Sequence, residues 1–310
     1  MIEVKNLTKL YGDFIAVDNI SFTVNKGEIV GFLGPNGAGK TTTMKMLTCY
    51  LSPNKGEIKL NNLDVFENSL DVRKNIGYLP ENTPVYEDLN VIESLEFFAQ
   101  IHHIDTEKRD KAIKRVIESC GLGEKLKNEV SELSKGYKQR LGLAQALIHN
   151  PDILILDEPT TGLDPNQIAE IRDLIKEIGK NKTIILSTHI LSEVEATCDR
   201  VIIINRGKIV GQDTPEGLKL RSEAANVVYI EFEGKLREAE EILRQIEGVK
   251  NLYKVDCDLP KVHRLRIETE NDLDLRKEIN HALQKNEMEL LEMRKEKASL
   301  EEVFRQLTSN

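Results

Sequence analysis

The sequence predicts an α/β protein with a mainly parallel core sheet, followed by a small α+β domain. Two observations support the core sheet. Stretches such as "EIVGFLG" (28–34) and "DILILDEP" (152–159) are continuous apolar runs, as expected of parallel strands covered on both faces. Helix-like runs alternate with them. The small domain is predicted because the order of elements changes to β-α-β-β-α-β after about residue 220.

The first 220 residues follow this alternation in order. The strand at 28–34 leads into a glycine loop, and a helix is predicted over 40–51. Met1 to about Leu220 therefore reads as one α/β domain with a mainly helical insertion. The remaining elements are short strands in 57–65, mostly helices over 89–148, and strands at 152–159, 183–189 and 200–210.

The tail from 221 to 310 forms a second predicted domain. A polar, turn-rich stretch at 212–226 separates the two parts. The order of elements in the tail is the split βαβ arrangement of small ferredoxin-like domains. They are a strand at 226–234, a helix at 235–248, two strands around "DLPK" (258–261), a helix at 273–286, a strand at 287–296 and a final short helix at 299–310.

Composition limits the classes of function. No stretch approaches the run of about 20 apolar residues that spans a bilayer, so a membrane role must come through partners. The N-terminal "MIEVKNLTKLYG" is charged and strand-like, unlike a secretory signal. The net charge of -9 disfavours general nucleic-acid binding. The four cysteines form no CxxC pair, which favours reduced thiols, and the six histidines show no metal-ligand spacing.

"GPNGAGKT" (34–41) matches the G-x-x-x-x-G-K-[ST] phosphate-binding pattern and lies between a predicted strand and a predicted helix. Its backbone N–H groups can close around phosphate oxygens, with the helix N-terminus adding its dipole. Lys40 supplies a charge near the β- and γ-phosphates, and Thr41 offers a hydroxyl to Mg²⁺. The predicted nucleotide-binding residues here are Gly34, Asn36, Gly37, Ala38, Gly39, Lys40, Thr41 and Thr42.

Two further strand ends carry candidate chemistry. Asp157 ends a buried strand, where its carboxylate can reach Mg²⁺ through water, and Glu158 could polarise an attacking water. Acids after an apolar strand can also simply cap it, but the phosphate loop favours the catalytic interpretation. His189 follows "IILST" at another strand end. A lone histidine there is usually structural, yet strand ends are where an α/β sheet binds ligands, so we interpret His189 as a γ-phosphate sensor.

The order of these motifs resembles that of the ATP-binding subunits of ABC transporters, from Met1 to about Leu220. Tyr11 is similar to the aromatic on which adenine stacks. "YLPEN", "LSKGYKQR", "TGLDP" and "STH" stand where that family has its Q-loop, signature, D-loop and switch-histidine loop; the D-loop contains Asp164, a predicted nucleotide-site residue. The resemblance implies a P-loop NTPase cassette with an antiparallel β subdomain, a helical subdomain at about 89–148, and ATP and Mg²⁺ as cofactors.

The resemblance also implies partners. In this family two cassettes pair head to tail, so that Ser134 and Gly136 would bind the γ-phosphate of ATP held by the other chain. With one cassette in the chain, a homodimer or a paired related cassette is expected. A separate multi-span permease would place the protein on the cytoplasmic face of the membrane. No nucleic-acid partner is expected.

Two positions depart from the family pattern. The usual Q-loop glutamine is Glu81, whose carboxylate can still ligate Mg²⁺ but, when ionised, can only accept hydrogen bonds, whereas glutamine also donates them. The first glycine of the signature is Lys135. A cation there could attract phosphate or point to solvent, and the sequence does not decide between the two.

The tail, which ends in "SLEEVFRQLT" (299–308), resembles that of bacterial exporter-type ATPases of the drug-resistance and gliding-motility groups. "GYLPEN" and "EPTTGLDPNQ" are most similar to the gliding-motility-associated subunits. The tail itself carries no site motif. A prop for the dimer, a spacer and a ligand-sensing domain all remain open.

Other classes of protein fit the sequence less well than a transporter subunit. A soluble ABC-type ATPase acting on ribosomes would carry two cassettes, and one acting on DNA would carry long coiled coils; the sequence has neither. A P-loop kinase needs no signature loop. A non-enzymatic ATP-sensing module is disfavoured by Glu158. The sequence is silent on the cargo.

Overall fold

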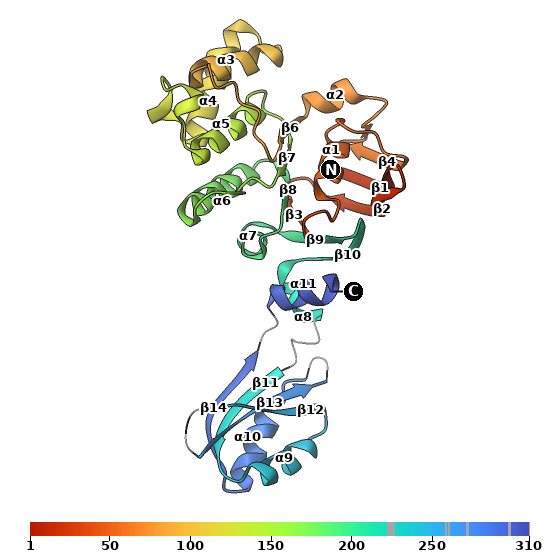
Figure 1. Ribbon diagram of the computed structural model, residues 1–310, viewed down its shortest axis with the longest axis vertical. Helices are drawn as coiled ribbons and strands as arrows, with labels where there is room; N and C mark the ends of the chain where they lie inside the picture. The colour runs from red at the N-terminus through yellow and green to blue at the C-terminus, as the bar shows by residue number, and fades with distance from the viewer. Residues whose placement is uncertain (222–226, 258, 260, 271–272, 297–298, 310) are drawn as a thin grey trace. The chain divides into compact units, whose positions relative to one another are not determined.

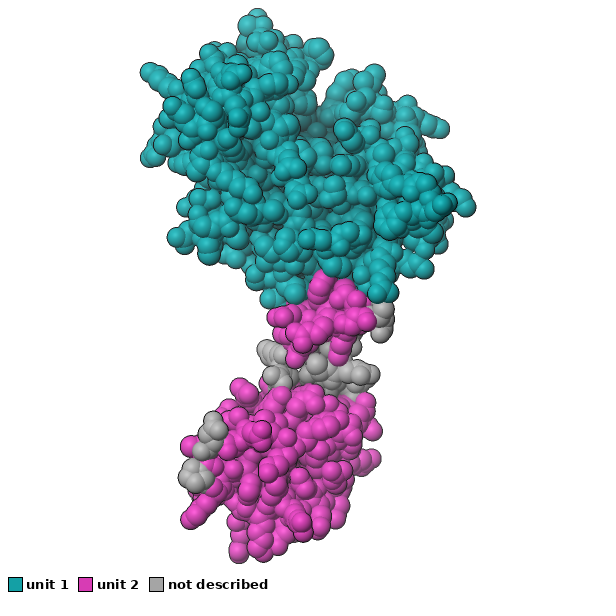
Figure 2. All heavy atoms as spheres, viewed as in Figure 1, with its two compact units in different colours: residues 1–215 teal, residues 216–310 magenta. Residues whose placement is uncertain are grey.

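The computed structural model describes residues 1–221, 227–257, 259, 261–270, 273–296 and 299–309. Two compact units, Met1–Pro215 and Glu216–Asn310, divide the chain (Figure 2). Each unit has its own sheet and its own hydrophobic core.

A six-stranded sheet, ordered β10-β9-β3-β8-β7-β6, forms the centre of the first unit. All neighbours are parallel except β10, which runs antiparallel at one edge. Both faces of the central strands are covered, and every residue of β3, β7 and β8 is buried. The mainly parallel core sheet predicted from the sequence is thus confirmed. The strands are β3 (Ile29–Leu33), β6 (Ile76–Leu79), β7 (Ile153–Asp157), β8 (Thr183–Thr188), β9 (Arg200–Asn205) and β10 (Lys208–Asp213).

The single strand predicted over 200–210 is wrong. β9 and β10 form an antiparallel hairpin there. The two residues of its turn, Arg206 (φ +47°) and Gly207 (φ +78°), both have left-handed backbone, which matches the twist of a tight hairpin. Arginine seldom has such a backbone conformation, so the residue types give little sign of a turn. The apolar residues on both sides therefore suggested one continuous strand.

A second, antiparallel sheet has the order β2-β1-β4-β5. It shares one hydrophobic core with the central sheet, in which the rings of Phe22 and Phe32 lie 5.6 Å apart. In Figure 1 this sheet and the helices α3 to α5 lie on opposite sides of the central strands. The antiparallel strands are β1 (Ile2–Tyr11), β2 (Phe14–Val24), β4 (Lys55–Leu60) and β5 (Leu63–Asp64).

Several longer helices of this unit have clear caps. Asn90 makes a capping box with Glu93 at the start of α3, and Gly121 ends α4 with left-handed backbone. The helices and short 3₁₀ turns are α1 (Lys40–Leu47), α2 (Ser69–Lys74), α3 (Val91–Ile101), α4 (Thr106–Cys120), η1 (Gly123–Lys125), η2 (Val130–Glu132), α5 (Lys135–Leu147), α6 (Pro165–Gly179) and α7 (Leu191–Thr197).

The helix predicted over 40–51 is four residues shorter in the structure. It ends at Leu47, and Cys49 has a φ of +60°, which a right-handed helix cannot contain. The Thr48 hydroxyl donates a hydrogen bond to the Met44 carbonyl at 3.0 Å, competing with the continuing helix. The apolar spacing that suggested a longer helix therefore extends past its end.

The second unit confirms the predicted βαββαβ order and its ferredoxin-like sheet. Its strand order, β12-β13-β11-β14, is antiparallel throughout, and its core contains the fully buried Phe232 and Leu265. The elements are β11 (Val227–Glu233), α9 (Leu236–Arg244), β12 (Val249–Val255), β13 (Val262–Thr269), α10 (Arg276–Lys285), β14 (Glu289–Glu296) and α11 (Leu300–Thr308).

The stretch predicted as a turn-rich connection is partly helical. β10 continues to Asp213, and α8 (Pro215–Arg221) begins at a proline, whose fixed φ suits the first helical position. The remainder of that stretch, 222–226, lies outside the described residues, as does part of the predicted turn at 258–261.

All four cysteines are free thiols, and Cys120 and Cys198 are buried. None of the helices in the described ranges combines the length and apolar character needed to cross a membrane.

We expect Phe232→Ala to lower the free energy of unfolding of the second unit by about 3–5 kcal/mol, because it leaves a cavity in that unit's core. Hydrogen exchange of the β11 and β13 amides measures this. Glu233→Ala, at the neighbouring exposed position, is the matched control and should change stability by less than about 0.5 kcal/mol. A similar loss in both variants would contradict the assigned core.

Candidate nucleotide site

The phosphate loop between β3 and α1 fits closely between strands on both sides. A Cβ on Gly34 would lie 2.4 Å from the carbonyl oxygen of Ile204 in β9, and one on Gly39 would lie 2.5 Å from that of Ala16 in β2. Gly39 also has a φ of +110°. Only glycine fits these two positions, because any side chain would collide with backbone.

The β9–β10 turn supports the same loop. The Gly207 N–H donates to the Ala38 carbonyl at 2.9 Å, and the Gly207 carbonyl accepts from the Asp18 N–H in β2, also at 2.9 Å. The hairpin therefore joins the phosphate loop to the antiparallel sheet.

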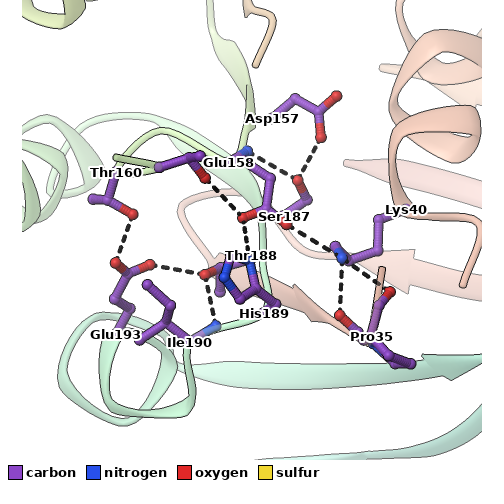
Figure 3. Close-up of polar contacts among 12 residues, drawn as sticks. Pro35, Lys40, Asp157, Glu158, Thr160, Ser187, Thr188, His189, Ile190 and Glu193 are labelled. Carbon is purple, nitrogen blue, oxygen red and sulfur yellow. Dashed lines mark hydrogen bonds and ion pairs between the residues drawn. The ribbon is translucent and has the colours of Figure 1, made fainter. Parts of the chain in front are cut away.

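Lys40, the first residue of α1, is 95% buried, with 5% of its surface exposed. Its ammonium group donates to the carbonyl oxygens of Gly34 (2.8 Å) and Pro35 (3.2 Å), and it lies 3.2 Å from a carboxylate oxygen of Glu158 (Figure 3). This places the Lys40 ammonium group at the phosphate loop, opposite the carboxylate of Glu158, which directly follows β7.

A cavity of about 420 Å³ opens at this loop and contains many of the predicted residues. Glu81, Glu158 and His189 lie on its wall together with the phosphate loop. Phe14, Ala16 and Thr161, which the sequence did not single out, also line it. The full lining is Tyr11, Phe14, Ala16, Asn36, Gly37, Gly39, Lys40, Thr41, Thr42, Glu81, Glu158, Thr161 and His189.

Two aromatic side chains form one end of the cavity. Tyr11 and Phe14 are paired across the β1–β2 turn and are both well exposed, at 49% and 63%. The Lys9 ammonium lies over the Tyr11 ring, 5.5 Å from its centroid, and donates to the Ser52 carbonyl. Phe14 could have been found from the sequence, since a hairpin closed by Gly12 and Asp13 places it opposite Tyr11.

Asp157 is fully buried at the end of β7. One carboxylate oxygen accepts hydrogen bonds from Ser187 (2.6 Å) and Thr41 (3.2 Å), and the other has no hydrogen-bond partner among the described residues. Burial raises the pKa of the Asp157 carboxyl above its usual range, and the nearby charges of Glu158 and Glu81 act in the same direction. The hydrogen bonds from Ser187 and Thr41 oppose that rise.

Glu158 has an unusual backbone. Its φ of +50° is left-handed, a conformation that costs a bulky residue energy and that must be held by its surroundings. Its N–H donates to both the carbonyl (3.1 Å) and the hydroxyl (3.0 Å) of Ser187 in β8. Ser187 was not predicted to matter, because a serine inside a buried strand carries no sequence signal of its own.

The Glu158 carboxylate lies between two nitrogen groups. His189 Nδ1 is 2.8 Å from one oxygen, and the Lys40 ammonium is 3.2 Å from the other. The Thr161 hydroxyl also donates to it at 3.2 Å. Figure 3 shows Lys40, Glu158 and His189 converging from three different segments. A carboxylate fixed in this way can accept a proton from a water molecule in the cavity.

Ser134, Gly136 and Asp164 do not line this cavity. Ser134 and Asp164 are N-caps: Ser134 accepts from the Tyr137 N–H of α5, and Asp164 from the N–H groups of Asn166 and Gln167 of α6. The chain thus keeps the signature loop apart from its own phosphate loop.

The side chain of Lys135, at the start of α5, lies against its own chain's Gly162. A Cβ on Gly162 would fall 2.2 Å from the Lys135 ammonium nitrogen. Gly136, next to it, is buried against Gln167 of α6. In the single chain, the exposed side chain of Lys135 therefore lies along the loop before α6.

Known proteins support the assignment suggested by this geometry. The family model described as "ABC transporter" matches residues 17–161. The bacitracin transport ATP-binding protein BcrA of Bacillus licheniformis is 43% identical over 75% of this chain and 74% of its own length. The chain belongs to the ATP-binding subunits of ABC transporters. The cassette is thus an ATPase domain of this family.

Other relatives differ in extent. The probable multidrug ABC transporter ATP-binding protein YbhF of Escherichia coli is 41% identical over 72% of this chain, but the chain spans only 38% of that protein. A dimeric ATP-binding cassette solved in a post-hydrolysis state with ADP and Pi is 26% identical, with a TM-score of 0.63; the match covers 69% of this chain and 98% of that one.

We expect Asp157→Asn to stabilise the cassette without ligands at neutral pH. The pKa of Asp157 lies above its ordinary value of 3.8 in the folded chain, so the ionised carboxylate lowers folding stability at pH values above the raised pKa. This penalty shrinks as pH falls and disappears below 3.8, where the side chain is protonated in both states. Removing the charge should gain on the order of 1 kcal/mol at pH 7 and little near pH 4.

Thermal unfolding at the two pH values measures this gain. Asp152→Asn, at an exposed position just before β7, removes the same charge and should leave stability nearly unchanged. A stabilisation of Asp157→Asn that is equal at both pH values would contradict the electrostatic cause.

Proposed function

We propose that this chain hydrolyses ATP as one of two paired cassettes that drive a separate membrane permease of the exporter type. The observation that carries the proposal is Glu158: a buried carboxylate in left-handed backbone, held between Lys40 and His189 on the wall of the cavity. The bacitracin and multidrug relatives support the exporter class. The narrower resemblance to gliding-motility subunits stays a prediction.

The residues at the cavity have different proposed roles in binding and hydrolysing ATP. The aromatic rings of Tyr11 and Phe14 offer surface on which adenine can stack. Lys40 and the N–H groups of the phosphate loop bind the phosphates. Glu158 accepts the proton of the attacking water, and His189 holds Glu158 in place while facing the γ-phosphate.

The site also suits Mg²⁺. Asp157 has a buried oxygen with no partner in the described part of the chain, and its other oxygen contacts the Thr41 hydroxyl. Carboxylate and hydroxyl oxygens are ligands that Mg²⁺ prefers, alongside phosphates and water. We therefore propose that Thr41, Asp157 and Glu81 hold it, directly or through water. When bound, Mg²⁺ neutralises charge on the phosphates.

The separation of Ser134 and Gly136 from the cavity supports a site built from two chains. Within one chain these residues do not line the cavity at the phosphate loop. In a head-to-tail pair, each signature loop would cover the ATP of its neighbour. The related cassette solved as a dimer supports such pairing. We further propose that the pair sits on the cytoplasmic face of the membrane through its permease and binds no nucleic acid.

Glu158→Gln should retain ATP binding and lower turnover by roughly 10²–10⁴-fold, because it removes the proton acceptor but keeps the shape of the side chain. Lys40→Ala should instead weaken ATP binding by about 10- to 100-fold, since a charge-assisted contact to phosphate is lost. Nucleotide titration and phosphate release measure the two effects. Near wild-type turnover of Glu158→Gln would exclude Glu158 as the base.

Mixing two inactive variants tests the two-chain site. A heterodimer of one Ser134→Arg chain and one Lys40→Ala chain carries both lesions in the same composite site and leaves the other intact. Each homodimer has both sites broken. We expect the mixture to recover measurable hydrolysis, up to about half of the wild-type rate if the sites act independently.

Wild type paired with the double variant is the reciprocal control, since in a head-to-tail pair each of its two composite sites carries one lesion, and we expect it to be inactive. Activity in this control but not in the mixture would exclude the head-to-tail arrangement. Inactivity of both would mean that the two sites must act together.

A further inference from the structure

Glu193, in the first turn of α7, is a buried carboxylate outside the cavity, with 5% of its surface exposed. Its two oxygens accept hydrogen bonds from two threonine hydroxyls: Thr160 at 2.5 Å and Thr188 at 2.8 Å. Figure 3 shows Glu193 between them, on the side of the His189 segment away from Lys40. Glu193 thus joins the loop after β7 to the end of β8.

Each threonine lies within two residues of a proposed catalytic residue in the sequence. Thr160 follows Glu158 by two residues. Thr188 directly precedes His189, and its hydroxyl also accepts the Ile190 N–H at 3.0 Å. Because that hydroxyl donates its proton to Glu193, its lone pair is left to face Ile190. The backbone is therefore held on both sides of His189.

These contacts form a closed ring. It runs from Glu193 through Thr188 to His189, across the 2.8 Å contact to Glu158, and back through Thr160. Removing the Glu193 carboxylate would free both hydroxyls and release both ends of the His189–Glu158 contact.

We propose that Glu193 is a positioning residue that sets the distance and angle between His189 and Glu158. The inference rests on the function proposed above and deepens it. A packing role alone would not require a charge, because burying a carboxylate costs several kcal/mol unless it is fully hydrogen-bonded, and an apolar side chain would fill the space more cheaply. Misplacing catalytic groups by about 1 Å can cost roughly 10²-fold in rate.

Glu193→Gln keeps the shape of the side chain but cannot accept hydrogen bonds at both of its terminal atoms. We expect kcat to fall by about 10-fold or more, with the ATP dissociation constant unchanged, because Glu193 touches no part of the cavity. Glu195→Gln, which removes an exposed carboxylate from the same helix, is the matched control and should retain wild-type kcat.

A double variant separates positioning from general stability. If Glu193 acts through His189, Glu193→Gln combined with His189→Ala should be no slower than His189→Ala alone. Multiplying losses would overturn the proposal, and so would an unchanged kcat in Glu193→Gln. An unchanged kcat in His189→Ala would refute the proposed role of His189 and this inference with it.

Substitutions at Thr160 test the ring from its other side, in case Glu193→Gln folds poorly. Thr160→Val has nearly the same shape but donates no hydrogen bond, so we expect kcat to fall as in Glu193→Gln. Thr160→Ser keeps the hydroxyl and should restore kcat. Equal rates in the valine and serine variants would overturn the proposal.

A readout without turnover distinguishes this inference from failure of the proposed function. In protein labelled with ¹⁵N-histidine, Glu193→Gln and Thr160→Val should both shift the Nδ1 signal of His189, since its contact with Glu158 changes. If the wild type hydrolyses no ATP but the signal shifts, the positioning role stands and the enzymatic proposal fails. An unmoved signal would overturn the positioning role.

Discussion

The pairing of β7 with β8 places Asp157 and Ser187 side by side in register, and the 2.6 Å hydrogen bond between them organises the rest of the site. The same serine accepts the N–H of Glu158 and so holds that residue in its left-handed backbone. A parallel sheet brings the carboxyl ends of its strands to one edge. One buried hydroxyl thereby fixes Asp157 and Glu158 relative to each other.

Charge burial sets the character of this region. Lys40, Asp157, Glu158 and Glu193 are all almost fully enclosed. The charged groups of these residues have described partners, except for one oxygen of Asp157. These partners offset much of the free-energy cost of removing the charges from water. The exception is the oxygen that we propose faces Mg²⁺. The site therefore holds its charged groups in fixed positions, and burial keeps the pKa of Asp157 above its usual value.

The sequence was sufficient for features that depend on local pattern. The parallel strands, the phosphate loop and the ferredoxin-like order follow from apolar runs, fixed spacing and turn residues, and the structure confirms them as elements. The sequence was insufficient for features that depend on side-chain contacts or on backbone angles. Ser187 contacts Asp157, 30 residues away, and Glu193 contacts Thr160, 33 residues away, so no local pattern marks these contacts. The end of α1 at Leu47 and the turn at Arg206 depend on backbone angles that the apolar pattern hides.

The turn at Arg206 and Gly207 has a consequence for how the molecule deforms. Gly207 is bonded at the same time to Ala38 of the phosphate loop and to Asp18 of the antiparallel sheet, while Gly39 touches Ala16 of that sheet. The phosphate loop and the antiparallel sheet that carries Tyr11 and Phe14 are thus both bonded to the β9–β10 turn. A hinge between them would have to break these contacts first. The end of the cavity at Tyr11 and Phe14 and the end at the phosphate loop are consequently held in a fixed relation to each other by backbone contacts.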